Sequence, residues 1–246
     1  MIPKLGKLAP KRSLKALPLS NYMKASAVPF PKVHAWERPI SYGMLANYRI
    51  GDCTCAGLVH QVMNWQAVAN AGTPFVVTDQ QVIDLYSAIT GYDGTPATDN
   101  GANETDVLNF WTNTGFLGHK IVGRATHDVQ NIDQIKAAIY VFGGVYIGFQ
   151  VPDYIMADPP VKVWDYTGQS YNVVGGHAVI QLGYGNSGMA VCSWGDIYHM
   201  TWAFWQQFVD EAYAVVSANW LKQSGISPTG LDLNGLLQDS AAAPTW

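Results

Sequence analysis

The sequence of 246 residues has little charge and little cysteine: 13% of its residues are charged and three are cysteines. A small, odd number of cysteines does not imply a disulfide framework, so a reducing compartment is the default expectation. No apolar run approaches the roughly 18 residues of a membrane span. Residues 1–22 lack the apolar stretch of about 7–15 residues that a secretory signal contains. These absences predict a protein that neither spans a membrane nor is secreted.

Several functional motifs are also missing. The glycine-rich segments lack the Lys-Ser/Thr pair of a phosphate-binding loop, and no internal repeat is evident. What remains is the composition of an ordinary globular protein, with 48% hydrophobic and 12% aromatic residues. A chain of this length can bury a sizeable core in one large domain.

Charge is distributed unevenly along the chain. Residues 1–38 carry eight basic residues and one acidic residue, a net charge of +7, and the remainder carries six basic and 17 acidic residues, a net charge of −11. Such a basic segment binds a polyanion, an acidic partner or the acidic surface of its own chain, or else it is a solvated tail. Nucleic-acid binding is not favoured, because no aromatic residues are interleaved with the basic ones.

Composition divides the chain into three regions. Residues 1–40 contain six prolines and predict an extended, basic N-terminal arm. Residues 41–221 form the body. Residues 222–246 are rich in glycine, serine, proline and alanine and predict a loose tail.

Within the body, helices are expected before strands. Helical spacing and stop signals predict helices over residues 53–72, 79–91, 104–114 and 133–142, the second with a capping box of Thr78 and Gln81. Short apolar runs predict strands over 145–151, 162–166, 177–183 and 189–193. Residues 201–209 predict a helix capped by Thr201, and residues 212–216 either extend it or form a last strand. The order indicates an α+β fold, with a helical lobe against a sheet lobe.

One cysteine and one histidine are candidates for chemistry. Cys53 precedes a helical run, where the positive end of the helix dipole favours a thiolate; the alternative is a small buried apolar residue. His177 follows two glycines and opens an apolar strand. A thiol and an imidazole together can carry out nucleophilic acyl transfer, although a lone histidine is more often structural. His60 lies two helical turns beyond Cys53, too far along the helix for that role.

Read in order, three motifs resemble the papain-like cysteine peptidases: Gly51-Asp52-Cys53, His177-Ala178-Val179 leading to Gly183-Tyr184-Gly185, and Ser193-Trp194-Gly195. The segments GANETDVLNFWTNTGFLG and IKAAIYVFGGVYIGFQV are similar to the family's intervening sequence. The resemblance covers residues 42–217 and is closest to a divergent bacterial or phage branch. It implies the two-lobed papain-like fold, with an N-terminal helical lobe and a C-terminal antiparallel sheet lobe.

The resemblance also implies roles for residues. Cys53 takes the place of the nucleophile and His177 that of the general base. The family has a glutamine six residues before its cysteine, whose amide joins the cysteine N–H in the oxyanion hole. Asn47 stands at that distance from Cys53, whereas Arg49 stands there for Cys55. Cys53 is therefore favoured over Cys55 as the nucleophile.

The chain departs from the family at the third catalytic position. Cys192 stands where the family has the asparagine that orients the imidazole, and a thiol is a poor hydrogen-bond acceptor. Either another group orients His177, with Asp196 and Asn186 as candidates, or the activity is weak or lost. Trp194 keeps the position that, in the family, shields the histidine and its partner from water.

Two functions follow. The first is a cofactor-free thiol hydrolase that cleaves peptide or amide bonds of a peptide or protein substrate. The alternative is a weak or inactive papain-fold protein with a structural or binding role, such as a phage virion component held through residues 1–38. Either would be cytoplasmic or virion-associated.

Two further expectations concern metal and propeptide. Cys53, Cys55, His177 and Cys192 would supply four soft ligands, but a one-residue gap does not match the usual spacing of zinc-binding cysteines, so no metal is expected. About 40 residues precede the body, so we expect no long inhibitory propeptide.

Overall fold

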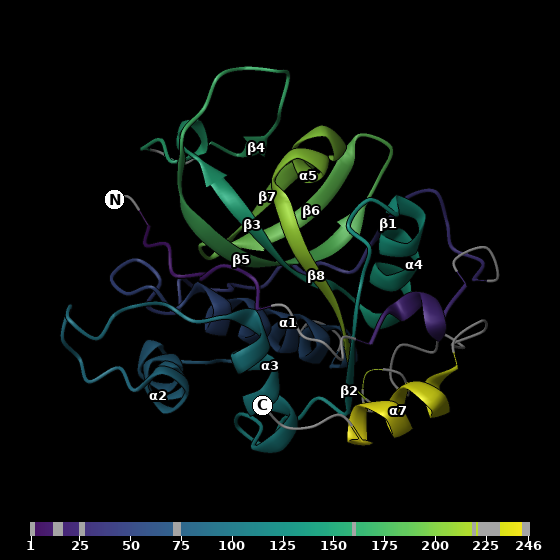
Figure 1. Ribbon diagram of the computed structural model, residues 1–246, viewed down its shortest axis with the longest axis horizontal. Coiled ribbons are helices and arrows are strands. Elements are labelled where there is room, and N and C mark those ends of the chain that lie inside the picture. Colours follow the sequence, from purple (N-terminus) through teal and green to yellow (C-terminus); the bar gives the residue numbers. More distant parts are fainter. Residues whose placement is uncertain are drawn as a thin grey trace.

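The computed structural model describes residues 3–11, 17–24, 28–70, 75–158, 161–217, 220 and 232–242. Helices α1 to α3 lie on one side of a strongly twisted sheet, and the N-terminal segment passes between the two layers (Figure 1). This α+β arrangement, with helices first and an antiparallel sheet after them, confirms the fold class predicted from the sequence.

The helices α1 to α5 begin and end close to where the sequence predicts, whereas α7 was not predicted. They are α1 (Cys53–Ala69), α2 (Asp79–Thr90), α3 (Glu104–Asn113), α4 (Ile132–Phe142), α5 (Trp202–Phe208) and α7 (Leu233–Ala242). The predicted capping box is present: Thr78 Oγ1 accepts from Gln81 N, and Gln81 Oε1 accepts from Thr78 N. Thr201 caps α5 in the same way, because its hydroxyl accepts from Phe204 N.

The sheet has the strand order β2-β8-β3-β5-β6-β7-β4, and β1 pairs with β5. Its strands are β1 (His34–Ala35), β2 (Gly123–Thr126), β3 (Val145–Pro152), β4 (Val163–Trp164), β5 (Val173–Tyr184), β6 (Gly188–Ser193), β7 (Asp196–Thr201) and β8 (Val209–Val216). All neighbours are antiparallel except β4 and β7. Residues 212–216, left open between helix and strand, belong to β8, because they pair with β2 and β3.

Three strands, β1, β2 and β7, were not predicted from the sequence, and the last two show why. β2 has the sequence Gly-Arg-Ala-Thr, which carries no apolar alternation, and it forms because it pairs with β8 at the sheet edge. β7 precedes the Thr201 cap and pairs with β6 across a short turn. Both depend on strand pairing rather than on a local signal.

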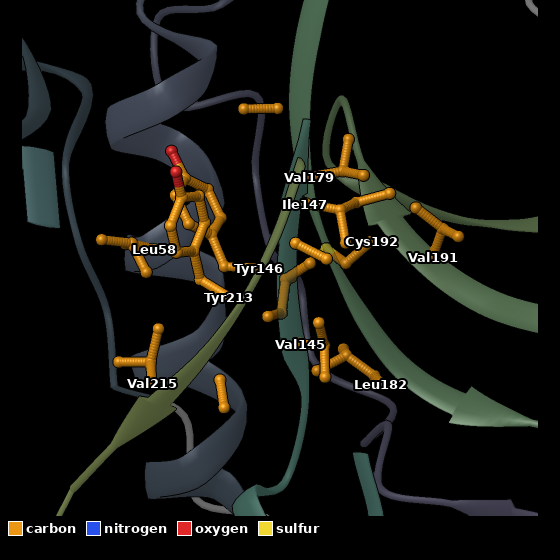
Figure 2. Packing of buried hydrophobic residues seen from close by; sticks show 14 of the residues in the cluster. Leu58, Val145, Tyr146, Ile147, Val179, Leu182, Val191, Cys192, Tyr213 and Val215 are labelled. Atoms are coloured by element: carbon orange, nitrogen blue, oxygen red, sulfur yellow. The ribbon is translucent and has the colours of Figure 1, made fainter. Parts of the chain in front are cut away.

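The core is built around α1, which is buried along almost its whole length. Gly57 lets this helix approach the sheet closely, since a Cβ there would lie 3.0 Å from Tyr146 Cε2. The Tyr146 hydroxyl donates to Thr54 O at 2.8 Å. Figure 2 shows Leu58, Tyr146 and Tyr213 packed between the helix and the strands.

The first 40 residues do not stand apart from the body where the structure describes them. Residues 3–11 cross the space between the helices and the sheet, and Thr126 N donates to Leu17 O further along. η1 (Leu19–Asn21) and β1 continue this path around the body. The expected arm is therefore mostly extended, as its prolines predict, and packed against its own chain.

The expected loose tail contains a helix. α7 packs on β2, and Leu236 is fully buried. Leu233, Leu236 and Leu237 recur at helical spacing within the alanine- and serine-rich text, which gives the helix an apolar face. Residues 221–231 and 243–246 of the tail lie outside the described residues. None of the helices in the described ranges has the length and apolar character needed to cross a bilayer.

Two helix ends offer a matched stability test. Gly91 and Gly143 both end helices with left-handed backbone, at φ 78° and 73°. A Cβ at Gly91 meets nothing, whereas one at Gly143 lies 2.4 Å from Trp220 Cζ2. Gly91→Ala should lower the free energy of unfolding by about 1–2 kcal/mol, from backbone strain alone. Gly143→Ala should lose about 1–3 kcal/mol more, from overpacking. Equal losses in urea unfolding would contradict this packing.

Candidate active site

Cys53 is the first residue of α1, as its position after Gly51-Asp52 predicts. Its backbone N–H has no intrahelical acceptor there, so it points out of the helix end with the neighbouring amides. Cys53 lines a small cavity together with Asn47, His177 and Trp194. The structure thus brings the predicted nucleophile, base, oxyanion donor and shielding residue to one place.

His177 reaches this cavity from the sheet. It lies on β5 opposite Phe149 of β3, and only 2% of its surface is exposed. Trp194 stacks on its ring, with centroids 4.6 Å apart and planes 23° apart. That placement agrees with the shielding role implied by the resemblance.

The turn between β6 and β7 sets the position of Trp194. Ser193 pairs with Asp196, which leaves Trp194 and Gly195 as a two-residue loop, with φ of 48° and 77°. Two left-handed residues form the type of hairpin turn that suits the twist of antiparallel strands. A tryptophan rarely adopts this backbone, and here it places the indole over the imidazole.

The residue that holds His177 is Ser193, which the sequence reasoning did not single out. His177 Nε2 and Ser193 Oγ are 2.8 Å apart, whereas Nδ1 has no hydrogen-bond partner in the described part of the chain. The sequence does contain a signal for this role. Ser193 directly follows Cys192, which stands at the family's asparagine position, and a hydroxyl accepts hydrogen bonds far better than a thiol.

Among the described residues, none of the other candidates for this role is hydrogen-bonded to His177. Cys192 lines the same cavity, but it is fully buried and packed among apolar side chains that include Ile147 and Val179 (Figure 2). Asp196 is exposed and forms an ion pair with Lys162. Asn186 is exposed in the turn after β5, nine residues beyond His177, which corresponds to about 30 Å of extended strand. The structure therefore brings neither Asp196 nor Asn186 to the imidazole.

Residues 4–8, called here the covering segment, lie over Cys53. Asn47 Nδ2 donates to Lys4 O at 3.2 Å, so a backbone carbonyl occupies the predicted oxyanion donor. Lys7 N donates to Gly176 O on the sheet side at 3.1 Å, and Leu8 N donates to Ala102 O on the helical side at 3.0 Å. Residues 4–8 of this chain thus occupy the space next to Cys53 and Asn47.

Cys53 and His177 have strongly shifted pKa values while the covering segment is in place. Burial raises the pKa of Cys53 to about 11, although hydrogen bonds from the backbone of Ala178 and Gly6 act in the opposite direction. Burial lowers the pKa of His177 to about 3, and the neighbouring His60 lowers it further. A thiol and a neutral imidazole are the expected forms at neutral pH.

His60 lines the same cavity, despite the expectation that it lies too far along α1. Residues seven apart share a helix face, which is why it points the same way as Cys53. Its Nε2 is 3.0 Å from Gly43 O, so one ring nitrogen is already engaged. Burial lowers the pKa of His60 to about 4. Among the residues placed by the structure, no group of three or more His, Cys, Asp or Glu is arranged to hold a metal ion.

Comparison with solved structures assigns the fold. The chain is similar to xylellain, a cysteine protease from Xylella fastidiosa, with a TM-score of 0.71 and 17% identity over 88% of this chain and 97% of that one. The chain has the papain-like fold. A procathepsin B from Trypanosoma congolense gives a TM-score of 0.58 at 9% identity, covering 86% of each chain. Procathepsin L 3 of Tenebrio molitor gives 0.53 at 14% identity, covering 85% of this chain and 76% of that one.

No protein-family model and no curated protein matches the sequence. The papain-like fold recognised from three short motifs is therefore a divergent one, since identity to these structures is 9–17%. Likeness at this level establishes the fold and leaves the roles of individual residues to the geometry of this chain.

The Ser193 contact predicts a tautomer. If Ser193 orients the imidazole for proton transfer from Cys53, then His177 carries its hydrogen on Nε2 and leaves Nδ1 as the acceptor. Nitrogen-15 NMR of the histidine side chains should show the Nε2–H form in the native chain and a mixture in Ser193→Ala. His127, which is also buried, should be unchanged in that variant. A native Nδ1–H form would overturn the assignment.

The covering segment predicts a guarded thiol. A Cβ at Gly6 would lie 1.7 Å from Gly51 O, so Gly6→Ala cannot keep the segment in place. Iodoacetamide should alkylate Cys53 about tenfold faster or more at pH 7.5 in this variant, since exposure removes the burial that raises the pKa. Leu8→Ala, which truncates a side chain 44% exposed, serves as the control and should react like the native chain. Equal rates in all three would show that the segment does not guard the thiol.

Proposed function

We propose that this chain is a thiol hydrolase that cleaves peptide or amide bonds with Cys53 and His177. The observation that carries the proposal is the meeting of Cys53, His177 and Asn47 in one cavity, where His177 Nδ1 has no hydrogen-bond partner among the described residues. The papain-like fold supports it, and similar structures include a cysteine protease.

The mechanism follows from these positions. His177 Nδ1 takes the thiol proton as Cys53 Sγ bonds to the substrate carbonyl carbon, and the oxyanion is held by Cys53 N–H and Asn47 Nδ2. The C–N bond then breaks and His177 returns the proton to the leaving amine. Water attacks the thioester, His177 takes its proton, and the acid leaves as Sγ recovers that proton.

Ser193 compensates for Cys192 in this scheme. The hydroxyl accepts from Nε2–H and fixes the ring, while Trp194 excludes water from that contact. A serine hydroxyl is neutral, so it stabilises the imidazolium less than a carboxylate would, and the turnover should be modest.

The alternative of a virion component held by its arm receives less support. It depends on a free basic segment, whereas residues 3–11 are held by hydrogen bonds and an ion pair to the rest of the chain. We therefore retain the hydrolase as the proposed function.

The test uses the uncovered thiol. In a Gly6→Ala background, Cys53 should be alkylated by iodoacetamide at pH 6 through a thiolate–imidazolium pair, and His177→Ala should restrict that labelling to pH above about 8.5. Hydrolysis of a peptide pool should fall by about 10⁴-fold or more in Cys53→Ala. Cys55→Ala is the matched control and should keep the activity. Turnover that survives Cys53→Ala would refute the proposal.

A further inference from the structure

Lys7 of the covering segment is a lysine buried in the interior. Its side chain is 1% exposed, and Nζ lies 2.9 Å from both Asp210 Oδ1 and Glu211 Oε1. Burial alone lowers the pKa of Lys7, but Glu211, Glu104 and Asp210 outweigh it, so the pKa is raised above its ordinary value. The ammonium therefore stays charged in the interior because the acidic side chains around it hold it there.

The residues around Lys7 form a pocket, here called the acidic pocket, of Glu104, Asp210 and Glu211. Tyr213 donates its hydroxyl to Glu211 Oε2 at 2.8 Å and holds that carboxylate in place. Glu104 is fully buried beside Glu211, and burial together with that neighbouring carboxylate raises the pKa of Glu104 well above its ordinary value. A structural ion pair needs one carboxylate for each ammonium, whereas Lys7 is surrounded by three carboxyl groups.

Gly148 leaves the space into which the lysine extends. A Cβ there would lie 1.8 Å from Lys7 Cε and 2.8 Å from Glu104 Oε2. A side chain at position 148 would therefore fill the acidic pocket. The space is as long as the hydrocarbon part of a lysine side chain, and the carboxyl groups lie at its far end.

The acidic pocket also lies beside the reacting atoms. Hydrogen bonds from the backbone of Gly6 reach Cys53, and Lys7 is the next residue along the same extended segment. A peptide bound along this path would place one side chain in the acidic pocket while its backbone passes Cys53.

We propose that the acidic pocket is the substrate-recognition pocket of this site, that it takes a lysine or arginine side chain within two residues of the scissile bond, and that Lys7 occupies it as a stand-in for that side chain. The inference rests on the proposed function, whose substrate class it specifies. Burial of an unpaired carboxylate is strongly unfavourable, so an apolar side chain would bind poorly here.

A binding test that does not require turnover comes first. Lys7→Glu, in the full chain, replaces attraction with repulsion and expels the covering segment from the acidic pocket. N-acetyl-lysine methylamide at about ten times its Kd should then raise Tm by about 3–6 °C. N-acetyl-norleucine methylamide, which has a similar stem and no charge, should not. Lys11→Glu is the control, because it makes the same charge change at an exposed ion pair with Asp106 and leaves the pocket filled.

Turnover provides the second test. The Lys7→Glu chain should cleave peptides with lysine or arginine near the scissile bond at least about tenfold faster than matched peptides with norleucine, and Glu211→Gln in that background should reduce the preference. Lys7→Ala replaces Lys7→Glu if the latter does not fold.

The outcomes separate the two proposals. Cleavage without a preference for basic residues, and no Tm shift, would overturn the acidic pocket and leave the hydrolase intact. A lysine-dependent Tm shift with no cleavage of any peptide would overturn both the hydrolase and the substrate role of the pocket.

Discussion

The burial of α1 against the sheet is the constraint on which the rest of this structure depends. A helix buried on nearly every side must be largely apolar and must pack against a sheet at close range. Gly57 of the helix leaves room for the Tyr146 ring, and the Tyr146 hydroxyl of the sheet donates to the helix backbone. The same contact fixes the N-terminus of α1 at the cavity beneath β5. Cys53 is therefore located by the core, and its chemistry follows from where the helix begins.

Local signals were sufficient for the elements that carry their own caps and periodicity. The Thr78 capping box, the helix that begins at Cys53 and the strand that carries His177 could all be read directly from the sequence. β2 could not, because its four residues acquire strand geometry only by pairing with β8. The tail helix α7 was hidden by its alanine-rich composition, although its leucines were correctly spaced.

The site shows the same division. The order of the motifs predicted that Cys53, His177 and Trp194 would meet, but strand alternation gave no reason to choose between Cys192 and its neighbour. In the structure Ser193, the last residue before the two-residue turn after β6, is the one that hydrogen-bonds to the imidazole, whereas Cys192 packs among apolar side chains at the edge of the same cavity. Likewise, composition predicted a basic segment that seeks acidic surface. Only the fold shows that the acidic partner lies in the same chain. Asp210 and Glu211 of β8, some two hundred positions away, form ion pairs with Lys7.

The covering segment links access to reactivity. While it is in place, the thiol is buried and the pKa of Cys53 stays high, and the imidazole is buried and its pKa stays low. Burial is the largest cause of both shifts, so exposure of the site to water relaxes both pKa values toward their ordinary ranges. Proton transfer from sulfur to nitrogen then becomes less unfavourable than in the covered state. Because the anchor of the segment is a buried lysine held by carboxylates, the group that opens the cleft most readily is one that can replace that lysine. Under the proposed recognition of basic side chains, substrate binding and activation of the nucleophile are a single event.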